Sequence, residues 1–219
     1  MKLYDTPLAP NPRRVRWFLA EKGPETWAKD IEVVTLNLMK GDQRQPDYVA
    51  KTGLPLAPVL ELDNGTCIGE SLAICRYLES RYPEPNLFGH DPEETAVIEM
   101  WTRRAELMVA HPLMNGVRHT HPAMAALEQQ DPAVGQRSLE AGVRALKVLD
   151  RQLEGREWLA ADRLTIADIV GFIGIDFGRM IKLRPPEELT NLVRWHAAMG
   201  ARPAAKAGMP PPRVEAAAS

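Results

Sequence analysis

The sequence predicts an α/β domain followed by an all-α domain, and two observations support this division. Strand and helix patterns alternate up to residue 82, whereas every later pattern up to residue 209 repeats at helical spacing. The segment 83–91 between them holds two prolines and a glycine and has little periodicity, as linkers do. We therefore expect domains at 1–82 and 92–209, joined by a linker at 83–91, and a disordered tail at 210–219.

The first domain should open with two strand-helix units. A loop rich in proline separates the first strand from the first helix. That helix should begin at Pro12 and end at Gly23, because proline is favoured in a first turn and glycine after a last one. The elements expected here are a strand at 2–4, a helix at 12–22, a strand at 31–38 and a short helix at 46–51.

A hairpin and a third helix should complete this domain. Asn64-Gly65 lies between two short apolar runs and tolerates the positive φ of tight turns. Pro58 cannot donate to a sheet ladder, so it should stand at the start of the hairpin's first strand. Ser71 then opens an apolar stripe at helical spacing. The resulting order, β-α-β-α-β-β-α, resembles a thioredoxin fold, in which helices flank a mixed sheet.

The second domain should be a bundle of helices separated by breaks that contain proline. A long helix starts at Asp91-Pro92 and should kink at Pro112. Thr165 and Asp168 form a capping box, in which each side chain bonds a free backbone N–H of the helix start. The expected helices lie at 92–118, 132–153, 166–182 and 189–199.

Composition argues against several classes of protein. The 27 basic and 29 acidic residues nearly balance, so a nucleic-acid-binding protein is not expected. No apolar run approaches the roughly 20 residues of a membrane span, and no apolar signal-peptide core follows Met1. The two cysteines, Cys67 and Cys75, are predicted to be buried structural thiols. We expect a cytoplasmic protein that binds neither nucleic acid nor membranes.

The stretch from Pro58 to Ser71 has the features of a site for a small acidic peptide. A helix N-terminus with unpaired N–H groups binds carboxylates, and Ser71 adds a hydroxyl there. A backbone edge beside Pro58 can pair with an extended peptide as an added strand. The alternative is a plain hairpin followed by a helix that Ser71 caps.

These residues resemble the glutathione-binding half of the glutathione S-transferase family, and the resemblance covers nearly the whole chain. In that family the residue before a cis-proline bonds the cysteinyl backbone of glutathione, and a Glu-Ser pair holds its γ-glutamyl end. The matching positions are Ala57, Pro58, Glu70 and Ser71. We expect the Ala57–Pro58 bond to be cis, because cis bonds are essentially confined to proline. Segments 39–44 and 118–124 look most like a bacterial and fungal branch with atypical catalysis.

The resemblance implies an enzyme that ionises the thiol of glutathione. Lowering a thiol pKa by two units takes roughly 2.7 kcal/mol, which one or two hydrogen-bond donors can supply. Relatives with a catalytic Ser or Cys carry it just before the first helix, where this chain has Ala9. Asn11 is the strongest remaining donor, with a plain N-cap role as the alternative. Tyr4 fits a packed strand tyrosine better than a catalytic one.

Other candidate residues follow from the same resemblance. His119 matches, better than His121, a histidine thought to hold a water near the sulfur; solvated histidines are the alternative for both. Gln43 matches a polar residue at the glycyl end of glutathione, or else is a solvated loop residue. No metal site is expected. An electrophile pocket should lie between the domains, and its candidate residues are Trp101, Arg104, Met108, His111 and Asn115.

We therefore predict a glutathione transferase that joins glutathione, its co-substrate, to a small hydrophobic electrophile, with peroxidase activity as a further possibility. Because the family is usually dimeric, a homodimer is expected. Two alternatives stay open. One is a non-enzymatic glutathione-binding or protein-interaction module, since Ala9 lacks the usual hydroxyl. The other is a glutathione-dependent isomerase or dehalogenase.

Overall fold

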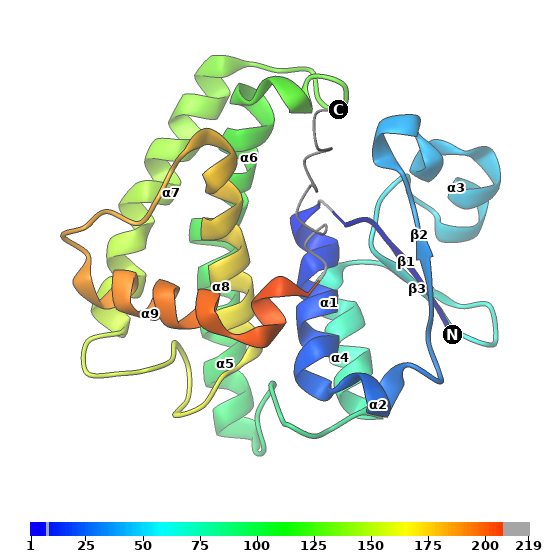
Figure 1. The fold of residues 1–219 in the computed structure, drawn as a ribbon, viewed down its shortest axis with the longest axis horizontal. Coiled ribbons are helices and arrows are strands. Elements are labelled where there is room, and N and C mark those ends of the chain that lie inside the picture. The colour runs from blue at the N-terminus through cyan, green and yellow to red at the C-terminus, as the bar shows by residue number, and fades with distance from the viewer. Residues whose placement is uncertain (8, 208–219) are drawn as a thin grey trace, which may run out of the picture.

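The chain folds into a mixed sheet flanked by helices, followed by a separate bundle of helices. A computed structural model describes residues 1–7 and 9–207. In Figure 1 the sheet stands on the right, the bundle stands on the left, and α1 and α4 lie between them. The predicted fold class, a thioredoxin-like domain followed by a helical domain, is confirmed. The tail expected at 210–219 lies outside the described residues.

The sheet has four strands in the order β2-β1-β3-β4. The edge strand β2 runs parallel to β1, while β3 is antiparallel to both β1 and β4. The second strand ends at Thr35, earlier than predicted, because the Asn37 side chain accepts two backbone N–H groups and starts a 3-10 turn. The strands are β1 (Lys2–Asp5), β2 (Glu32–Thr35), β3 (Val59–Glu61) and β4 (Cys67–Ile68).

The first helix begins earlier than predicted. Ala9 takes the extended N-cap conformation and Pro10, not Pro12, is the first helical residue. Gly23, at φ 80°, ends this helix, and the short α2 that follows was not predicted. The helices of this domain are α1 (Pro10–Lys22), α2 (Pro24–Trp27), α3 (Pro46–Thr52) and α4 (Ser71–Arg81), with 3-10 turns η1 (Leu38–Lys40) and η2 (Asp42–Arg44).

The hairpin forms as predicted. Gly65 adopts φ 83° in the turn between β3 and β4. Pro58 directly precedes β3, and the Ala57–Pro58 peptide bond is cis, which confirms that prediction. The Glu84–Pro85 bond is also cis.

The long helix of the second domain passes through Pro112 without ending. A π-helical segment, η3, precedes the proline, which has no N–H for the usual bond four residues back. A Cβ at Gly174 of α8 would collide with Ala110, so glycine lets the two helices cross closely. The elements are α5 (Pro92–Arg104), η3 (Ala105–Ala110), α6 (His111–Thr120), η4 (Pro122–Met124), α7 (Pro132–Gln152), α8 (Ile166–Phe177), η5 (Gly178–Ile181), α9 (Thr190–Ala201) and η6 (Pro203–Lys206).

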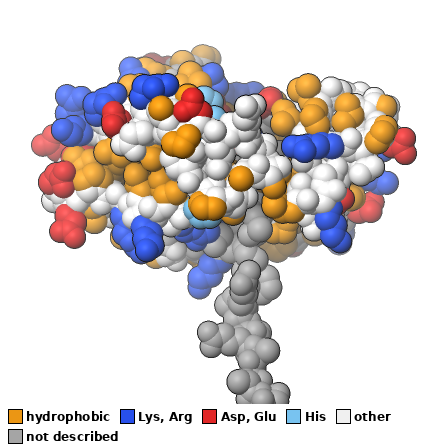
Figure 2. Space-filling model, turned by 90° about the horizontal axis from the view of Figure 1, so that it is seen from above, with side chains coloured by type: hydrophobic (Ala, Val, Ile, Leu, Met, Phe, Trp, Pro, Cys, Tyr) orange, Lys and Arg blue, Asp and Glu red, His pale blue; other side chains and the backbone are white. Residues whose placement is uncertain are grey.

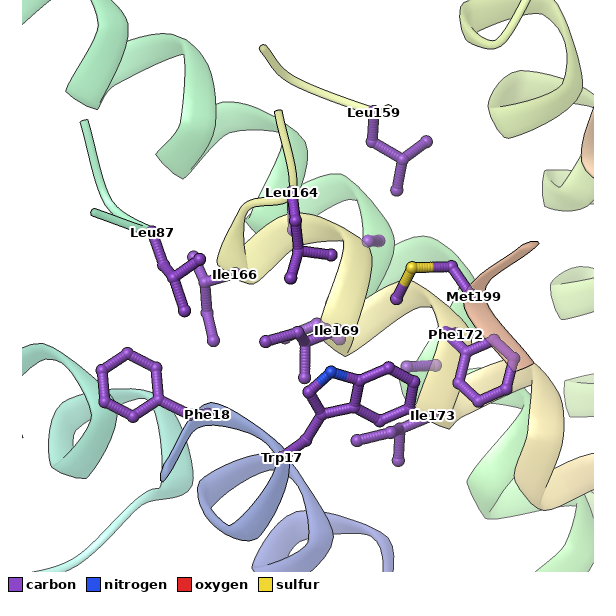
Figure 3. Packing of buried hydrophobic residues seen from close by; sticks show 14 of the residues in the cluster. Trp17, Phe18, Leu87, Leu159, Leu164, Ile166, Ile169, Phe172, Ile173 and Met199 are labelled. Carbon is purple, nitrogen blue, oxygen red and sulfur yellow. The ribbon is translucent and has the colours of Figure 1, made fainter. Parts of the chain in front are cut away.

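One hydrophobic core joins the two domains. Trp17 of α1 points toward Ile169, Phe172 and Ile173 of α8 (Figure 3), and the ring centroids of Trp17 and Phe172 are 5.1 Å apart. Trp17 is fully buried. Its ring therefore anchors α1 to the second domain, although α1 begins beside the sheet of the first.

Buried charges fix the segment between the domains. The Lys22 ammonium lies 2.7 Å from Glu79 and donates to the Pro85 carbonyl at 2.6 Å. Glu79 also accepts the backbone N–H of Leu87. Burial lowers the pKa of Lys22, and Glu79 opposes that shift. The chain that leaves α4 is thus tied to α1.

The predicted capping box starts α8. The Asp168 carboxylate accepts the backbone N–H of Thr165 at 3.0 Å and that of Leu159 at 2.9 Å. The indole N–H of Trp195 adds a third bond at 3.0 Å. Because all of these groups are buried, one carboxylate ties α8 to α9 and to the preceding loop.

Glu94 gives a pH-dependent prediction. Both of its carboxylate oxygens accept hydrogen bonds from Arg163, and these bonds hold the pKa of Glu94 down at about 2. A depressed carboxyl pKa stabilises the fold above the ordinary value of 4.5, and the stabilisation disappears as pH falls toward about 2. Glu94→Gln should lower the Tm at neutral pH by a few degrees. The difference from the unsubstituted protein should vanish near the acid limit, and a difference that stays constant with pH would contradict it.

Candidate active site

The backbone of Ala57 is open for pairing. Ala57 precedes the cis Pro58, and β3 begins only at Val59. Neither the N–H nor the C=O of Ala57 bonds to any backbone group in the described part of the chain. Tyr48 donates its hydroxyl to the Leu56 carbonyl at 2.6 Å and holds the loop from behind. This edge can therefore receive an extended peptide.

The start of α4 has a strained backbone. Glu70 adopts φ 60° and ψ 119°, a combination that few residues other than glycine occupy. Glu70, not Ser71, takes the N-cap position, so the capping alternative for Ser71 is contradicted. Ser71 is the first helical residue and is only 4% exposed. Strain of this kind persists where the surroundings enforce it, which is common at ligand-binding turns.

Arg14 joins Ser71 to the second domain. Its Nη1 lies 3.4 Å from Ser71 Oγ and 2.8 Å from Glu106 Oε1, which belongs to η3. Burial lowers the pKa of Arg14, and the Glu106 carboxylate opposes that shift. This contact was not predicted from the sequence. A signal existed, because arginines at positions 13, 14 and 16 interrupt the apolar face of the helix, and buried arginine needs a partner.

Arg16 fixes the loop that leads into α1. Its guanidinium pairs with the Asp5 carboxylate and donates to the carbonyls of Thr6 and Pro7, both at 2.9 Å. Burial raises the pKa of Asp5, and Arg16 opposes that shift. These contacts with Arg16 therefore hold the backbone of residues 5–7, which leads into the first turn of α1.

Asn11 is the polar residue of that first turn. It is the second helical residue, so its interpretation as a plain N-cap is wrong. Its side-chain oxygen is buried and has no hydrogen-bond partner within the described chain. Pro10 and Pro12 on either side have no N–H, and the Arg13 N–H already bonds to Ala9. The donors left at this helix N-terminus are those of Asn11.

The side-chain oxygen of Gln43 is also buried without a hydrogen-bond partner in the described chain. The residue lies in η2 and is 5% exposed. The alternative of a solvated loop glutamine is therefore wrong. An unpaired buried amide costs free energy, which a bound ligand can recover.

Tyr4 and the two cysteine thiols of the first domain have structural roles. Tyr4 donates to Glu61 at 2.6 Å and packs edge-on against Tyr48, so the prediction of a packed strand tyrosine is confirmed. The bond to Glu61 raises the pKa of Tyr4. Cys75 is buried and Cys67 is half-buried, and burial raises the pKa of both thiols. Neither is suited to act as a thiolate.

Both candidate histidines accept backbone hydrogen bonds. His119, in the last turn of α6, accepts the N–H of Asp131 on Nδ1 at 3.0 Å. His121 accepts the N–H of Ala123 at 3.2 Å. Both residues are half-buried, and both hydrogen bonds lie at exposed positions. No contact joins His119 to Asn11 among the described residues, so its catalytic role stays a prediction.

The predicted electrophile residues are spread along the long helix from α5 to α6 and differ in burial. The Arg104 guanidinium covers the ring of Trp101 at 4.7 Å. Met108 and His111 are exposed, and Asn115 donates to Ser138 of α7 at 2.8 Å. By contrast, the ion pairs to the first domain come from Glu99 and Glu106 of this helix. The five-residue pocket therefore stays a prediction.

Neither a metal centre nor a membrane helix is found where the structure describes the chain. Over residues 1–7 and 9–207, no three His, Cys, Asp or Glu side chains gather closely enough to hold a metal ion. Within those same ranges, none of the helices has the length and apolar character that crossing a bilayer requires.

Comparisons with known proteins agree with this geometry. Family models match residues 3–86 (glutathione S-transferase, N-terminal domain) and residues 109–203 (glutathione S-transferase, C-terminal domain). Glutathione S-transferase 2 of Saccharomyces cerevisiae is 36% identical over 208 residues, which span 94% of this chain and 88% of the yeast protein. The crystal structure of Gtt2 from Saccharomyces cerevisiae has a TM-score of 0.86 at 35% identity, covering 95% of this chain and all of that one. A Methylobacillus flagellatus glutathione S-transferase, solved with GSH bound, has a TM-score of 0.78 at 26% identity, covering 96% and 99%.

The protein thus has a thioredoxin-like domain, in which the Ala57 backbone is free to pair with a peptide, followed by a helical domain. The chain belongs to the glutathione S-transferase family. It is a glutathione transferase, as predicted, and the similarity to a yeast member agrees with the predicted fungal and bacterial branch. The alternatives of a non-enzymatic module or a glutathione-dependent isomerase or dehalogenase are not favoured.

Proposed function

We propose that this enzyme conjugates the thiolate of glutathione to a small hydrophobic electrophile, and that it does so in the cytoplasm as part of detoxification. The observation that carries the proposal is the place of Asn11 in the first turn of α1, between two prolines that have no N–H to donate. A helix N-terminus favours negative charge, and an amide there adds a donor that does not ionise.

Three places would hold the three parts of glutathione. The open Ala57 backbone beside Pro58 would pair with the cysteinyl backbone. Glu70 and Ser71 at the start of α4 would hold the γ-glutamyl group, and Gln43 would contact the glycyl end. The Methylobacillus flagellatus relative was solved with GSH bound, which supports glutathione as the ligand of this chain.

The chemistry then needs only a stabilised thiolate. Asn11 would donate to the sulfur, and His119 would contribute through a water or not at all. The sulfur lone pair attacks the electrophilic carbon, a carbon–sulfur bond forms, and the leaving group departs with the bonding electrons. With an aryl halide the products are the thioether and a halide ion, and the thiol proton has gone to solvent.

The test combines conjugation with binding. We expect turnover of a chlorodinitrobenzene with glutathione, together with saturable glutathione binding by calorimetry. A peroxide in place of the aryl halide tests for peroxidase activity in the same assay. Binding without turnover of any electrophile would overturn the proposal in favour of a binding module, and absence of binding would overturn it altogether.

We further propose a homodimer. Large apolar side chains stay exposed on both domains; Met100 and Leu107 of the long helix are 40% and 53% exposed, and Leu54 and Leu56 are 57% and 53% exposed. In the view from above the domain boundary, hydrophobic side chains gather over both domains (Figure 2). Patches of this kind mark protein interfaces, and a second copy would cover both.

Light scattering at micromolar concentration should give twice the chain mass of 24.4 kDa. Leu107→Glu should shift the mass toward one chain, because it places a charge in the apolar contact. Val193→Glu, at an apolar residue of α9 that is 38% exposed, is the matched control and should stay dimeric. A monomeric unsubstituted protein would refute the dimer.

A further inference from the structure

We propose that Glu106 of the helical domain is a positioning residue for glutathione, and that it acts through Arg14 on the hydroxyl of Ser71. The affinity for glutathione would then depend on a carboxylate outside the glutathione-binding domain. This inference rests on the proposed role of Ser71 in holding the γ-glutamyl carboxylate. It concerns a chain of contacts from η3, across α1, to the start of α4.

The orientation of the Ser71 hydroxyl follows from what Arg14 can do. A guanidinium only donates, so its N–H must address a lone pair of Ser71 Oγ. The hydroxyl proton then points away from Arg14 and is available to an acceptor. At 3.4 Å this hydrogen bond is long and weak, so its main effect is on the orientation of the Ser71 hydroxyl. A carboxylate at the N-terminus of α4 is the acceptor that this arrangement suits.

Glu106 holds the Arg14 guanidinium that orients the Ser71 hydroxyl. Arg14 is only 2% exposed, and a buried cation requires a counter-charge. Glu106 Oε1 lies 2.8 Å from the same Nη1 atom that addresses Ser71. The Nε atom of Arg14 is buried without a partner within the described chain. The Glu106 contact therefore decides where Nη1 stands relative to Ser71.

The position of Glu106 is set mainly by the segment that carries it. Its other oxygen lies 2.6 Å from Arg103 on the preceding turn, but that side chain is 48% exposed, so this ion pair does little to hold the carboxylate. The segment η3 that carries it packs closely on α8, where Gly174 meets Ala110. A shift of the helical domain relative to α1 would move the carboxylate, and with it Arg14 and Ser71.

The direct test is Glu106→Gln, which keeps the size and one acceptor oxygen but removes the charge. The KM and the calorimetric Kd for glutathione should rise about tenfold, the effect of weakening a hydrogen bond to a charged group. The kcat at saturating glutathione and the KM for the electrophile should change by no more than about twofold. Glu106, Arg14 and Ser71 act on the γ-glutamyl end of glutathione and not on its sulfur. A structural defect alone would not separate these constants.

Two variants serve as matched controls. Asp176→Asn removes the ion pair of the neighbouring Arg13, which also joins α1 to the helical domain but does not reach Ser71. Arg103→Gln removes the other partner of Glu106 and leaves Arg14 untouched. Both should keep the KM for glutathione within about twofold of the unsubstituted enzyme. Equal losses in Glu106→Gln and Asp176→Asn would overturn the inference, because any loosened domain contact would then suffice.

A double-mutant comparison separates this inference from the proposed function. Once Ser71→Ala has removed the hydroxyl, adding Glu106→Gln should weaken binding by no more than about twofold further. If Ser71→Ala weakens binding but Glu106→Gln does not, only the inference fails. If the unsubstituted enzyme does not bind glutathione, the proposed function fails first. Should Glu106→Gln not fold, Arg14→Lys keeps the charge and replaces the fork by a single ammonium, and a KM like that of the unsubstituted enzyme would then count against the inference.

Discussion

Ser71→Ala should weaken glutathione binding by about 1–3 kcal/mol, which corresponds to roughly 5- to 150-fold in Kd. The hydroxyl is a side-chain donor at the N-terminus of α4, and the contact with Arg14 leaves its proton pointing away from the guanidinium. Alanine leaves the ligand carboxylate short of one hydrogen bond, and it removes the contact of Arg14 Nη1 with Ser71 while the contact with Glu106 remains. The backbone N–H groups of the helix start remain, so binding should weaken but persist.

Calorimetry with glutathione measures this effect directly. Ser80→Ala is the matched control, because Ser80 lies in the last turn of the same helix and its hydroxyl bonds only to the Tyr77 carbonyl. It should bind glutathione like the unsubstituted enzyme. Unchanged affinity in Ser71→Ala would show that the hydroxyl serves the fold alone.

Local signals explain why much of the fold could be predicted. Asn64-Gly65 specifies a turn by its own backbone preferences, and Asp131 starts α7 by accepting the N–H groups of Ala133 and Val134. The capping box at Thr165 and Asp168 works in the same way. In each case the partners lie within a few residues, so the sequence shows both sides of the interaction.

The site was harder to predict where partners are distant in sequence. Arg14 and Glu106 are separated by 92 residues, and no periodicity links them. Glu106 lies two residues from both Arg104 and Met108, so the predicted stripe ran along another side of the long helix and did not include this glutamate. The start of α1 was hard to predict for a local reason. Pro10 and Pro12 both suit a first helical turn, and sequence alone could not choose between them.

Asn11→Ala should raise the pKa of the bound glutathione thiol and reduce turnover at neutral pH by roughly 10- to 100-fold, the equivalent of about 1.4–2.7 kcal/mol. Ala9 offers no hydroxyl, and the prolines beside Asn11 offer no N–H, so the loss of this amide leaves one backbone donor in the turn. A thiol near pKa 8.5 is only a few per cent ionised at neutral pH without such help. The defect should therefore shrink at high pH, where free thiolate is abundant.

The thiolate absorbance of bound glutathione, titrated for the unsubstituted enzyme, Asn11→Ala and His119→Ala, distinguishes the two candidate donors. A raised midpoint in Asn11→Ala alone supports direct donation from the Asn11 amide N–H group in the first turn of α1. A raised midpoint in His119→Ala alone would reverse the assignment, although Nδ1 of that ring already accepts the Asp131 N–H. If neither midpoint moves, the backbone N–H of Asn11 or the hydroxyl of the buried Thr6 must stabilise the sulfur, and Thr6→Val would then carry the defect or leave the backbone as the donor.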